Sequence, residues 1–144
     1  MKVYCDSSVL VAASISSHPH HAQASALFKQ IQAERLEALI SAHGIAEFHA
    51  VLTRMPVTPA IHPTEAWQLL AQNILPHFQL VSLTAAQYKS VLREAAEKAW
   101  TGGLVYDALH LAAAASNQCK RIYTFNLRHF LRIAPRLQDI ICSP

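Results

Sequence analysis

Three acidic residues lie on segments that are otherwise apolar, and side chains of this type can do chemistry. Asp6 follows an apolar run, Glu47 lies among small and aromatic residues, and Asp107 stands inside a long apolar stretch. An ionised carboxylate away from water is costly unless a partner or a cation compensates its charge. The other acidic residues have polar or charge-mixed neighbours typical of a solvated surface, and they are Glu34, Glu37, Glu65, Glu94, Glu97 and Asp139. The first three are therefore the candidate functional residues.

Carboxylates brought together from distant segments repel one another unless a cation lies between them. Mg²⁺ and Mn²⁺ prefer oxygen ligands, and they keep several waters when a few carboxylates and a substrate phosphate bind them. Such an ion can lower the pKa of a bound water, orient a phosphate and neutralise charge in the transition state. Asp6, Glu47 and Asp107 together favour a Mg²⁺ or Mn²⁺ site suited to phosphodiester hydrolysis.

Each candidate also has a purely structural interpretation. Asp6 can cap the helix that follows it. Asp107 can cap a helix or complement its positive end, and Glu47 can lie on the polar side of a surface helix. Ser8 and Thr124, at the ends of predicted strands, can bond a carboxylate or a metal-bound water, or they can bond only the local backbone.

The histidines give a weaker signal. Three of them cluster around Pro19, but no further ligand stands at zinc spacing, so a solvated turn is favoured for His18, His20 and His21. Three others lie near the acidic segments, where a helical histidine is usually just partly buried but can contact substrate, and they are His49, His110 and His129.

Strands alternate with helices along the chain. The patterns predict strands at residues 2–5, 38–41, 78–82 and 121–125, and helices at about 8–16, 20–33, 43–53, 64–72, 84–99 and 104–116, with a further short helix from 126. Thr64 and Thr84 are the expected N-caps of their helices. This order predicts an α/β fold of three α/β/α layers around a mainly parallel sheet. Asp6 and Asn126 follow predicted strands, so both should lie at the carboxyl edge of the sheet, where ligand sites gather.

The length and the composition of the chain agree with one compact domain over residues 1–144. A hydrophobic fraction of 52% with only 15% charged residues favours a fold that buries further surface in a partner. No apolar run reaches a membrane span and no signal peptide is visible, so we expect a cytoplasmic protein with reduced thiols. Basic residues concentrate near the C-terminus, which fits either a phosphodiester substrate or a solubilising surface.

The order of the motifs resembles that of the PIN domain, and more closely that of the small bacterial VapC-type toxins. The motifs are Val-Tyr-Cys-Asp6-Ser-Ser, Ala46-Glu47, Asp107-Ala-Leu-His110 after a Gly-Gly pair, and Thr124-Phe-Asn126-Leu-Arg-His-Phe130. The likeness covers almost the whole chain. It implies a single PIN domain that binds Mg²⁺ or Mn²⁺, cuts RNA, forms a homodimer and is inhibited by an antitoxin whose C-terminal segment fills the active-site groove.

Carried over by position, the resemblance makes Asp6, Glu47 and Asp107 the metal-binding carboxylates. Thr124 would support the site, and Asn126 stands where many relatives have a fourth acid. Because an amide brings no negative charge, Asn126 should hold a second cation less well than Asp would.

We therefore expect a metal-dependent endoribonuclease, the toxin of a type II toxin–antitoxin pair, that leaves a 5′-phosphate and a 3′-hydroxyl. Asp6, Glu47, Asp107 and Asn126 would form the catalytic site, with Ser8 and Thr124 in support. Two alternatives stay open. One is a PIN-like binding module that no longer cuts, which only Asn126 favours. The other is an acidic-cluster nuclease that acts on DNA, because no base-reading motif in the sequence distinguishes RNA from DNA as the substrate.

Overall fold

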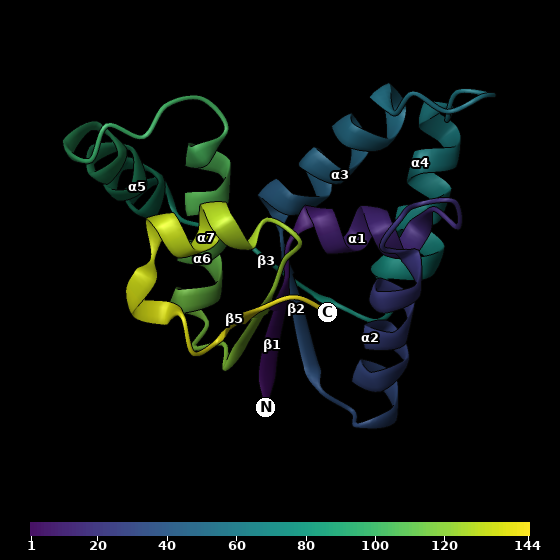
Figure 1. Ribbon diagram of the computed structural model, residues 1–144, viewed down its shortest axis with the longest axis horizontal. Helices are drawn as coiled ribbons and strands as arrows, with labels where there is room; N and C mark the ends of the chain where they lie inside the picture. The colour runs from purple at the N-terminus through teal and green to yellow at the C-terminus, as the bar shows by residue number, and fades with distance from the viewer.

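The computed structural model describes residues 1–144, and a five-stranded parallel sheet lies at its centre (Figure 1). The strands are β1 (Lys2–Cys5), β2 (Glu37–Ser41), β3 (Gln79–Val81), β4 (Arg121–Tyr123) and β5 (Ile141–Cys142). Their order across the sheet is β3-β2-β1-β4-β5, and every neighbouring pair is parallel. The predicted parallel sheet is confirmed, and it has a fifth strand near the C-terminus that the sequence patterns did not predict.

Helices cover both faces of the sheet. They are α1 (Ser7–Ser14), α2 (His21–Ala33), α3 (Ala42–Arg54), α4 (Pro63–Leu69), α5 (Ala85–Glu97), α6 (Leu104–Ser116) and α7 (Leu127–Ile133), with a π-helical turn η1 (Leu70–Ile74) and a 3-10 turn η2 (Pro135–Leu137). Figure 1 shows α1 to α4 on one side of the sheet and α5 to α7 on the other. The three-layer α/β/α prediction is therefore confirmed.

The alternation of side chains along the central strand divides the core in two. Val3 and Cys5 pack into the cluster beneath α1 to α4, whereas Tyr4 packs into the cluster beneath α5 to α7. All three side chains are almost completely buried. Successive residues of a strand point to opposite faces, and a strand buried on both faces is consequently apolar throughout.

The start of α4 differs from the prediction. His62, not Thr64, is the N-cap, because its side chain accepts a hydrogen bond from the backbone N–H of Thr64 and Glu65 completes a capping box. Pro63 then occupies the first helical position, where its missing N–H costs nothing. The prediction for Thr84 is confirmed, since its hydroxyl accepts a hydrogen bond of 3.2 Å from the N–H of Gln87.

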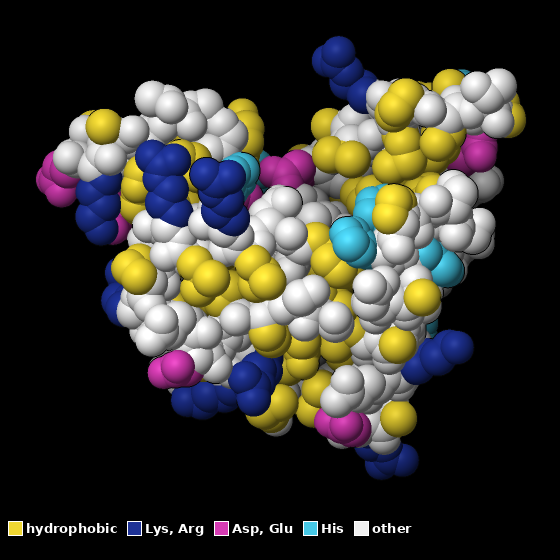
Figure 2. Space-filling model, viewed as in Figure 1, with side chains coloured by type: hydrophobic (Ala, Val, Ile, Leu, Met, Phe, Trp, Pro, Cys, Tyr) yellow, Lys and Arg dark blue, Asp and Glu magenta, His cyan; other side chains and the backbone are white.

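The surface is hollowed between the two helical layers at the carboxyl edge of the sheet. Figure 2 shows acidic side chains in this hollow and Lys and Arg side chains on the adjacent wall, over the layer that holds α7. Arg128 and Arg132, both on α7, are exposed. No helix of the structure combines the length and the apolar character needed to cross a membrane.

Candidate active site

Asp6 lies one residue beyond β1 and is only 1% exposed. It is the N-cap of α1, because its Oδ1 accepts a hydrogen bond of 3.1 Å from the N–H of Val9. The hydroxyl of Ser8 donates to the same oxygen at 2.6 Å, and the hydroxyl of Thr124 donates to Oδ2 at 2.7 Å. Burial raises the pKa of this carboxyl above its usual value, although His110 and the two hydroxyls oppose the rise. Asp6 is thus both a helix cap and a buried, oriented carboxylate.

The two supporting hydroxyls also bind the backbone. Ser8 Oγ accepts a hydrogen bond of 3.0 Å from the N–H of Phe125, and Thr124 Oγ1 accepts one of 2.8 Å from the N–H of Asn126. Both structural alternatives from the sequence therefore hold at once, since each hydroxyl donates to a carboxylate and accepts from a backbone amide. The two residues link Asp6 to the turn between β4 and α7.

Glu47 projects from α3, and three polar side chains hold it. The Ser7 hydroxyl donates to its Oε1, His43 Nε2 lies 3.1 Å from its Oε2, and His110 Nε2 lies 3.2 Å from its Oε1. Burial disfavours the charged form, but the two histidines and the serine outweigh burial and hold the pKa of Glu47 well below its usual range. Glu47 is therefore an ionised and oriented carboxylate, not a free side chain on a helix surface.

Asp107 lies in the first turn of α6 and is 8% exposed. Its Oδ2 lies 3.2 Å from Nδ1 of His129 on α7. Burial raises the pKa of Asp107 above its usual value and the charge of Asp6 adds to the rise, whereas His110 and His129 oppose it. The N-cap of α6 is Gly103, so Asp107 complements the helix dipole without capping the helix.

His110 joins the three carboxylates and is the main residue that the sequence interpretation undervalued. It is 1% exposed, its Nε2 contacts Glu47, and its charge influences both Asp6 and Asp107. Its other nitrogen, Nδ1, lies 2.7 Å from the hydroxyl of Tyr4. The available signal was its position three residues after Asp107, which places both on one side of the helix.

Gly44 permits the close approach of α3 to α6. A Cβ atom at this position would lie 3.1 Å from Oγ of Ser41 and 3.2 Å from Cε1 of His110. Such contacts are tighter than ordinary van der Waals separation, so a larger residue would push the two helices apart. The glycine thereby helps to place His110 against Glu47.

Asn126 lies on a cleft beside these carboxylates. The cleft has a volume of about 410 Å³, and its lining includes Ser7, Ser8, Glu47, Phe125 and Asn126. Asn126 is exposed, and its side chain makes no capping hydrogen bond to α7. The structure therefore brings all four acidic or amide candidates to the carboxyl edge of the sheet, where the sequence placed Asp6 and Asn126.

The lining of the cleft also includes His18 and His20. The ring of His20 stacks on Phe125 with centroids 4.5 Å apart and planes 12° from parallel. His21 turns away, because its Nδ1 lies 2.9 Å from the carbonyl oxygen of Ala12. The interpretation of these histidines as a solvated turn is incomplete, since two of them line the cleft.

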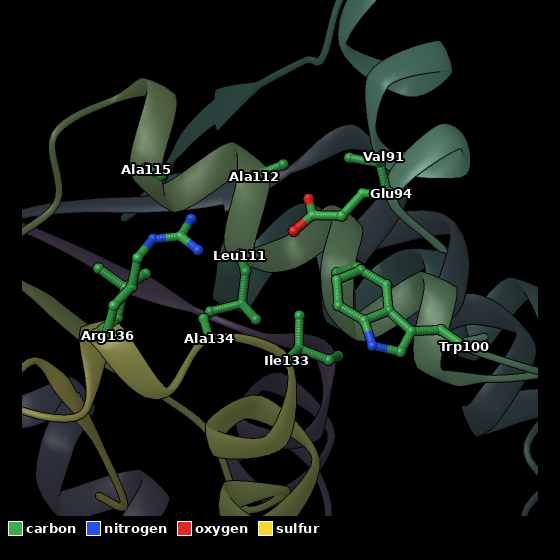
Figure 3. A pocket seen from close by; sticks show the side chains of 11 residues that line it. Val91, Glu94, Trp100, Leu111, Ala112, Ala115, Ile133, Ala134 and Arg136 are labelled. Atoms are coloured by element: carbon green, nitrogen blue, oxygen red, sulfur yellow. The ribbon is translucent and has the colours of Figure 1, made fainter. Parts of the chain in front are cut away.

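A second pocket lies among α5, α6 and the segment after α7, and it is not a comparable site (Figure 3). Its volume is about 80 Å³, and its lining is mostly apolar. Ligand pockets usually measure about 300–1,000 Å³. Glu94 and Arg136 approach it from opposite sides, but no group of carboxylates converges there.

Comparisons with known proteins identify the family to which the chain belongs. A model of the PIN domain matches residues 3–135, and the chain belongs to this family. Ribonuclease VapC27 of Mycobacterium tuberculosis is 35% identical over 115 residues, which are 80% of this chain and 78% of the relative. The predicted resemblance to the PIN domain and to VapC-type proteins is confirmed.

Solved structures support the fold. VapC20 of Mycobacterium tuberculosis, described as a Sarcin-Ricin loop cleaving toxin, has a TM-score of 0.69 at 16% identity and covers 88% of this chain and 92% of its own. VapBC2 of Rickettsia felis, solved with a DNA fragment from its promoter, has a TM-score of 0.71 at 18% identity. The match covers 100% of this chain and 99% of the VapBC2 chain. At this level of identity the likeness concerns the arrangement of the elements.

Proposed function

We propose that this protein is a divalent-metal-dependent endoribonuclease and the toxin of a type II toxin–antitoxin pair. One observation carries the proposal: Asp6, Glu47 and Asp107, from three separate elements, surround the buried His110 beside an open cleft. The relative named as a ribonuclease supports the same class of activity.

The donor set fits a hard cation. Asp6, Glu47 and Asp107 supply only oxygen atoms, and burial raises the pKa of both aspartates because their charges lack full compensation. These three residues would hold Mg²⁺ or Mn²⁺, the ions that prefer such ligands. When bound, the ion supplies charge neutralisation at the phosphate and a more acidic water.

The chain's own residues orient the carboxylates. Ser8 and Thr124 fix the two oxygens of Asp6, while Ser7 and His43 fix Glu47. Carboxylates held in one rotamer lose less freedom when a ligand binds, which favours binding in a single geometry.

The cleft and its rim fit a nucleotide chain. A volume of about 410 Å³ is large enough for one nucleotide, and the stacked pair of His20 and Phe125 offers an aromatic face for a base. The amide of Asn126 can donate to a phosphate oxygen. The exposed Arg128 and Arg132 add positive charge along the path of a bound RNA. We expect hydrolysis to leave a 5′-phosphate and a 3′-hydroxyl.

Two protein partners complete the proposal: a second copy of the chain and a cognate antitoxin, both in the cytoplasm. The chain exposes several large apolar side chains, among them Val51, Trp67, Leu80, Leu92 and Tyr106. Val51 lies on the rim of the cleft, so an antitoxin segment that covers it would also block access to Glu47. Exposed apolar groups of this kind mark surfaces that bind partners.

The test is cleavage of a mixed pool of end-labelled structured RNAs and single-stranded DNA. Wild type with Mn²⁺ should cut RNA, whereas EDTA or Asp6→Asn should abolish cutting. Asp139→Asn is the matched control, because it removes an exposed carboxylate that lies outside the motifs and outside the lining of the cleft. If Asp6→Asn cuts as wild type does, the proposed site is wrong.

The absence of a fourth acid at Asn126 favours a second candidate, a PIN-like module that binds RNA or a partner without cutting. A protein of that kind should bind RNA with equal affinity in Mn²⁺ and in EDTA. Measured RNA affinities under the two conditions, alongside the cleavage assay, separate the two functions.

A further inference from the structure

Two histidines and a glutamate converge at one end of α3. His43 Nε2 lies 3.1 Å from one oxygen of Glu47, and His110 Nε2 lies 3.2 Å from the other. One ligand atom from each of the three side chains lies within 4.8 Å of both others. In a tetrahedral zinc site with bonds of about 2.0–2.2 Å, neighbouring ligand atoms are about 3.3 Å apart. Each histidine nitrogen is therefore at about this spacing from one oxygen of Glu47, and the three side chains converge closely enough for one ion.

The ring of His110 is held in place by a further contact. His110 Nδ1 lies 2.7 Å from the Tyr4 hydroxyl. The contact with Tyr4 orients the ring so that Nε2 faces Glu47. Metal-binding histidines are commonly oriented in this way through their second nitrogen.

His43 is the more accessible of the two histidines. Its ring stacks on Tyr106 with centroids 5.0 Å apart, and its side chain is 18% exposed. His110 is only 1% exposed, so it is the more constrained of the two histidines.

The charge and chemistry of the cluster select the class of cation. Imidazole nitrogen suits Zn²⁺, Co²⁺ and Ni²⁺, whereas Mg²⁺ prefers oxygen ligands. The nearby carboxylates of Asp6 and Asp107 add negative charge, which attracts a cation of either class.

We propose that His43, Glu47 and His110 form a distinct site for a borderline transition-metal ion, Zn²⁺ in particular, which withdraws Glu47 from the Mg²⁺ or Mn²⁺ centre. The binding site stands on the geometry alone. The consequence, that Zn²⁺ inhibits cleavage supported by Mn²⁺, rests on the proposed function. The two statements are tested separately.

The binding test is a titration of the full-length protein, free of any histidine tag, with Zn²⁺ by calorimetry and with Co²⁺ by visible absorption. Wild type should bind one ion, and Co²⁺ should give the intense bands of a four-coordinate site. His43→Gln should weaken binding at least about tenfold. His49→Gln removes an exposed histidine from the same helix and should leave binding unchanged.

Asp107→Asn tests whether this site is separate from the carboxylate centre, and it should lose much less Zn²⁺ affinity than His43→Gln because it removes nearby charge but no ligand. If His43→Gln binds as tightly as wild type, or if Asp107→Asn loses as much affinity as His43→Gln, the site is wrong. Glu47→Gln serves as the second ligand variant should His43→Gln fail to melt cooperatively, and it too should lose at least about tenfold in affinity.

The inhibition test adds one equivalent of Zn²⁺ to the Mn²⁺-dependent cleavage of RNA by wild type. We expect a clear loss of rate that EDTA followed by excess Mn²⁺ reverses. If Zn²⁺ binds at the histidines and the cleavage rate does not change, the proposed competition for Glu47 is wrong, but the proposed Zn²⁺ site is not contradicted. If no cleavage occurs with Mn²⁺ alone, the proposed function fails and the binding result is unaffected.

Discussion

The hydroxyl of Thr124 donates a hydrogen bond of 2.7 Å to Oδ2 of Asp6, although 118 residues separate the two in sequence. The register of the parallel sheet makes this contact. Cys5 pairs with Tyr123, so the next residue of each strand lies at the same edge. A buried carboxylate of the candidate site is therefore oriented by a hydroxyl on the neighbouring strand.

Thr124→Val tests this orienting role. The valine keeps the shape of the side chain but removes the donor to Asp6 and the acceptor for the N–H of Asn126. We expect RNA cleavage to fall about 10–100-fold, the usual effect of losing a partner that orients a metal ligand. Thr124→Ser should recover most of the activity.

Thr53→Val is the control for this substitution. Its hydroxyl lies on the exposed face of α3 and bonds only the carbonyls of its own helix. Equal losses of activity in Thr53→Val and Thr124→Val would mean that Thr124 has no specific role in the site.

Asp107→Asn should abolish cleavage yet stabilise the metal-free fold at neutral pH. Burial raises the pKa of Asp107 in the folded protein above its value in the unfolded chain. The contribution of Asp107 to stability is therefore complete at pH values below the unfolded pKa, and it is lost as the pH rises through the folded pKa. The uncharged amide of the Asn variant avoids this loss of stability at higher pH. Thermal melts in EDTA should therefore show a difference in melting temperature that favours the variant and is larger at pH 7 than at pH 4.

A difference of the opposite sign, with the variant melting below wild type at pH 7, would contradict this account of Asp107. Asp139→Asn, at an exposed position, should show no such dependence on pH.

Asn126→Asp should strengthen the binding of Mn²⁺. The residue lies on the same cleft as Glu47, and a fourth carboxylate would add charge and an oxygen ligand. We expect a several-fold gain in Mn²⁺ affinity by calorimetry and a larger rise in melting temperature with Mn²⁺ than wild type shows. Asn73→Asp adds the same charge on η1, away from the cleft lining, and should give no gain.

Gly44→Ala should destabilise the protein and disturb the site. Its new methyl group would press on Ser41 Oγ at 3.1 Å and His110 Cε1 at 3.2 Å. We expect a loss of about 1–3 kcal/mol in the free energy of unfolding, measured by urea denaturation. Gly103→Ala is the matched control, because nothing lies within 4 Å of a Cβ atom there.

If both alanine variants change the free energy of unfolding equally, the close approach of α3 to α6 does not account for the glycine. A selective loss in Gly44→Ala, together with weaker RNA cleavage, would tie this glycine to the placement of His110.

The sequence by itself determined the alternation of strands and helices and the three carboxylates on apolar segments. It also placed Asp6 directly after a strand. These features depend on local periodicity and on the cost of burying a charge, both of which can be read along one segment. Thr84 illustrates the same point, since a cap and its partner lie only three residues apart.

Only the tertiary structure decided which side chains meet. His110 reaches Glu47 across 63 residues and Tyr4 across 106 residues, and no local pattern reports such a pair. These contacts depend on the order of strands in the sheet and on the rotation of α3 against α6, which the packing of the whole core sets. The sequence could therefore name the carboxylates, whereas the histidines that hold Glu47 emerged only when the chain was folded.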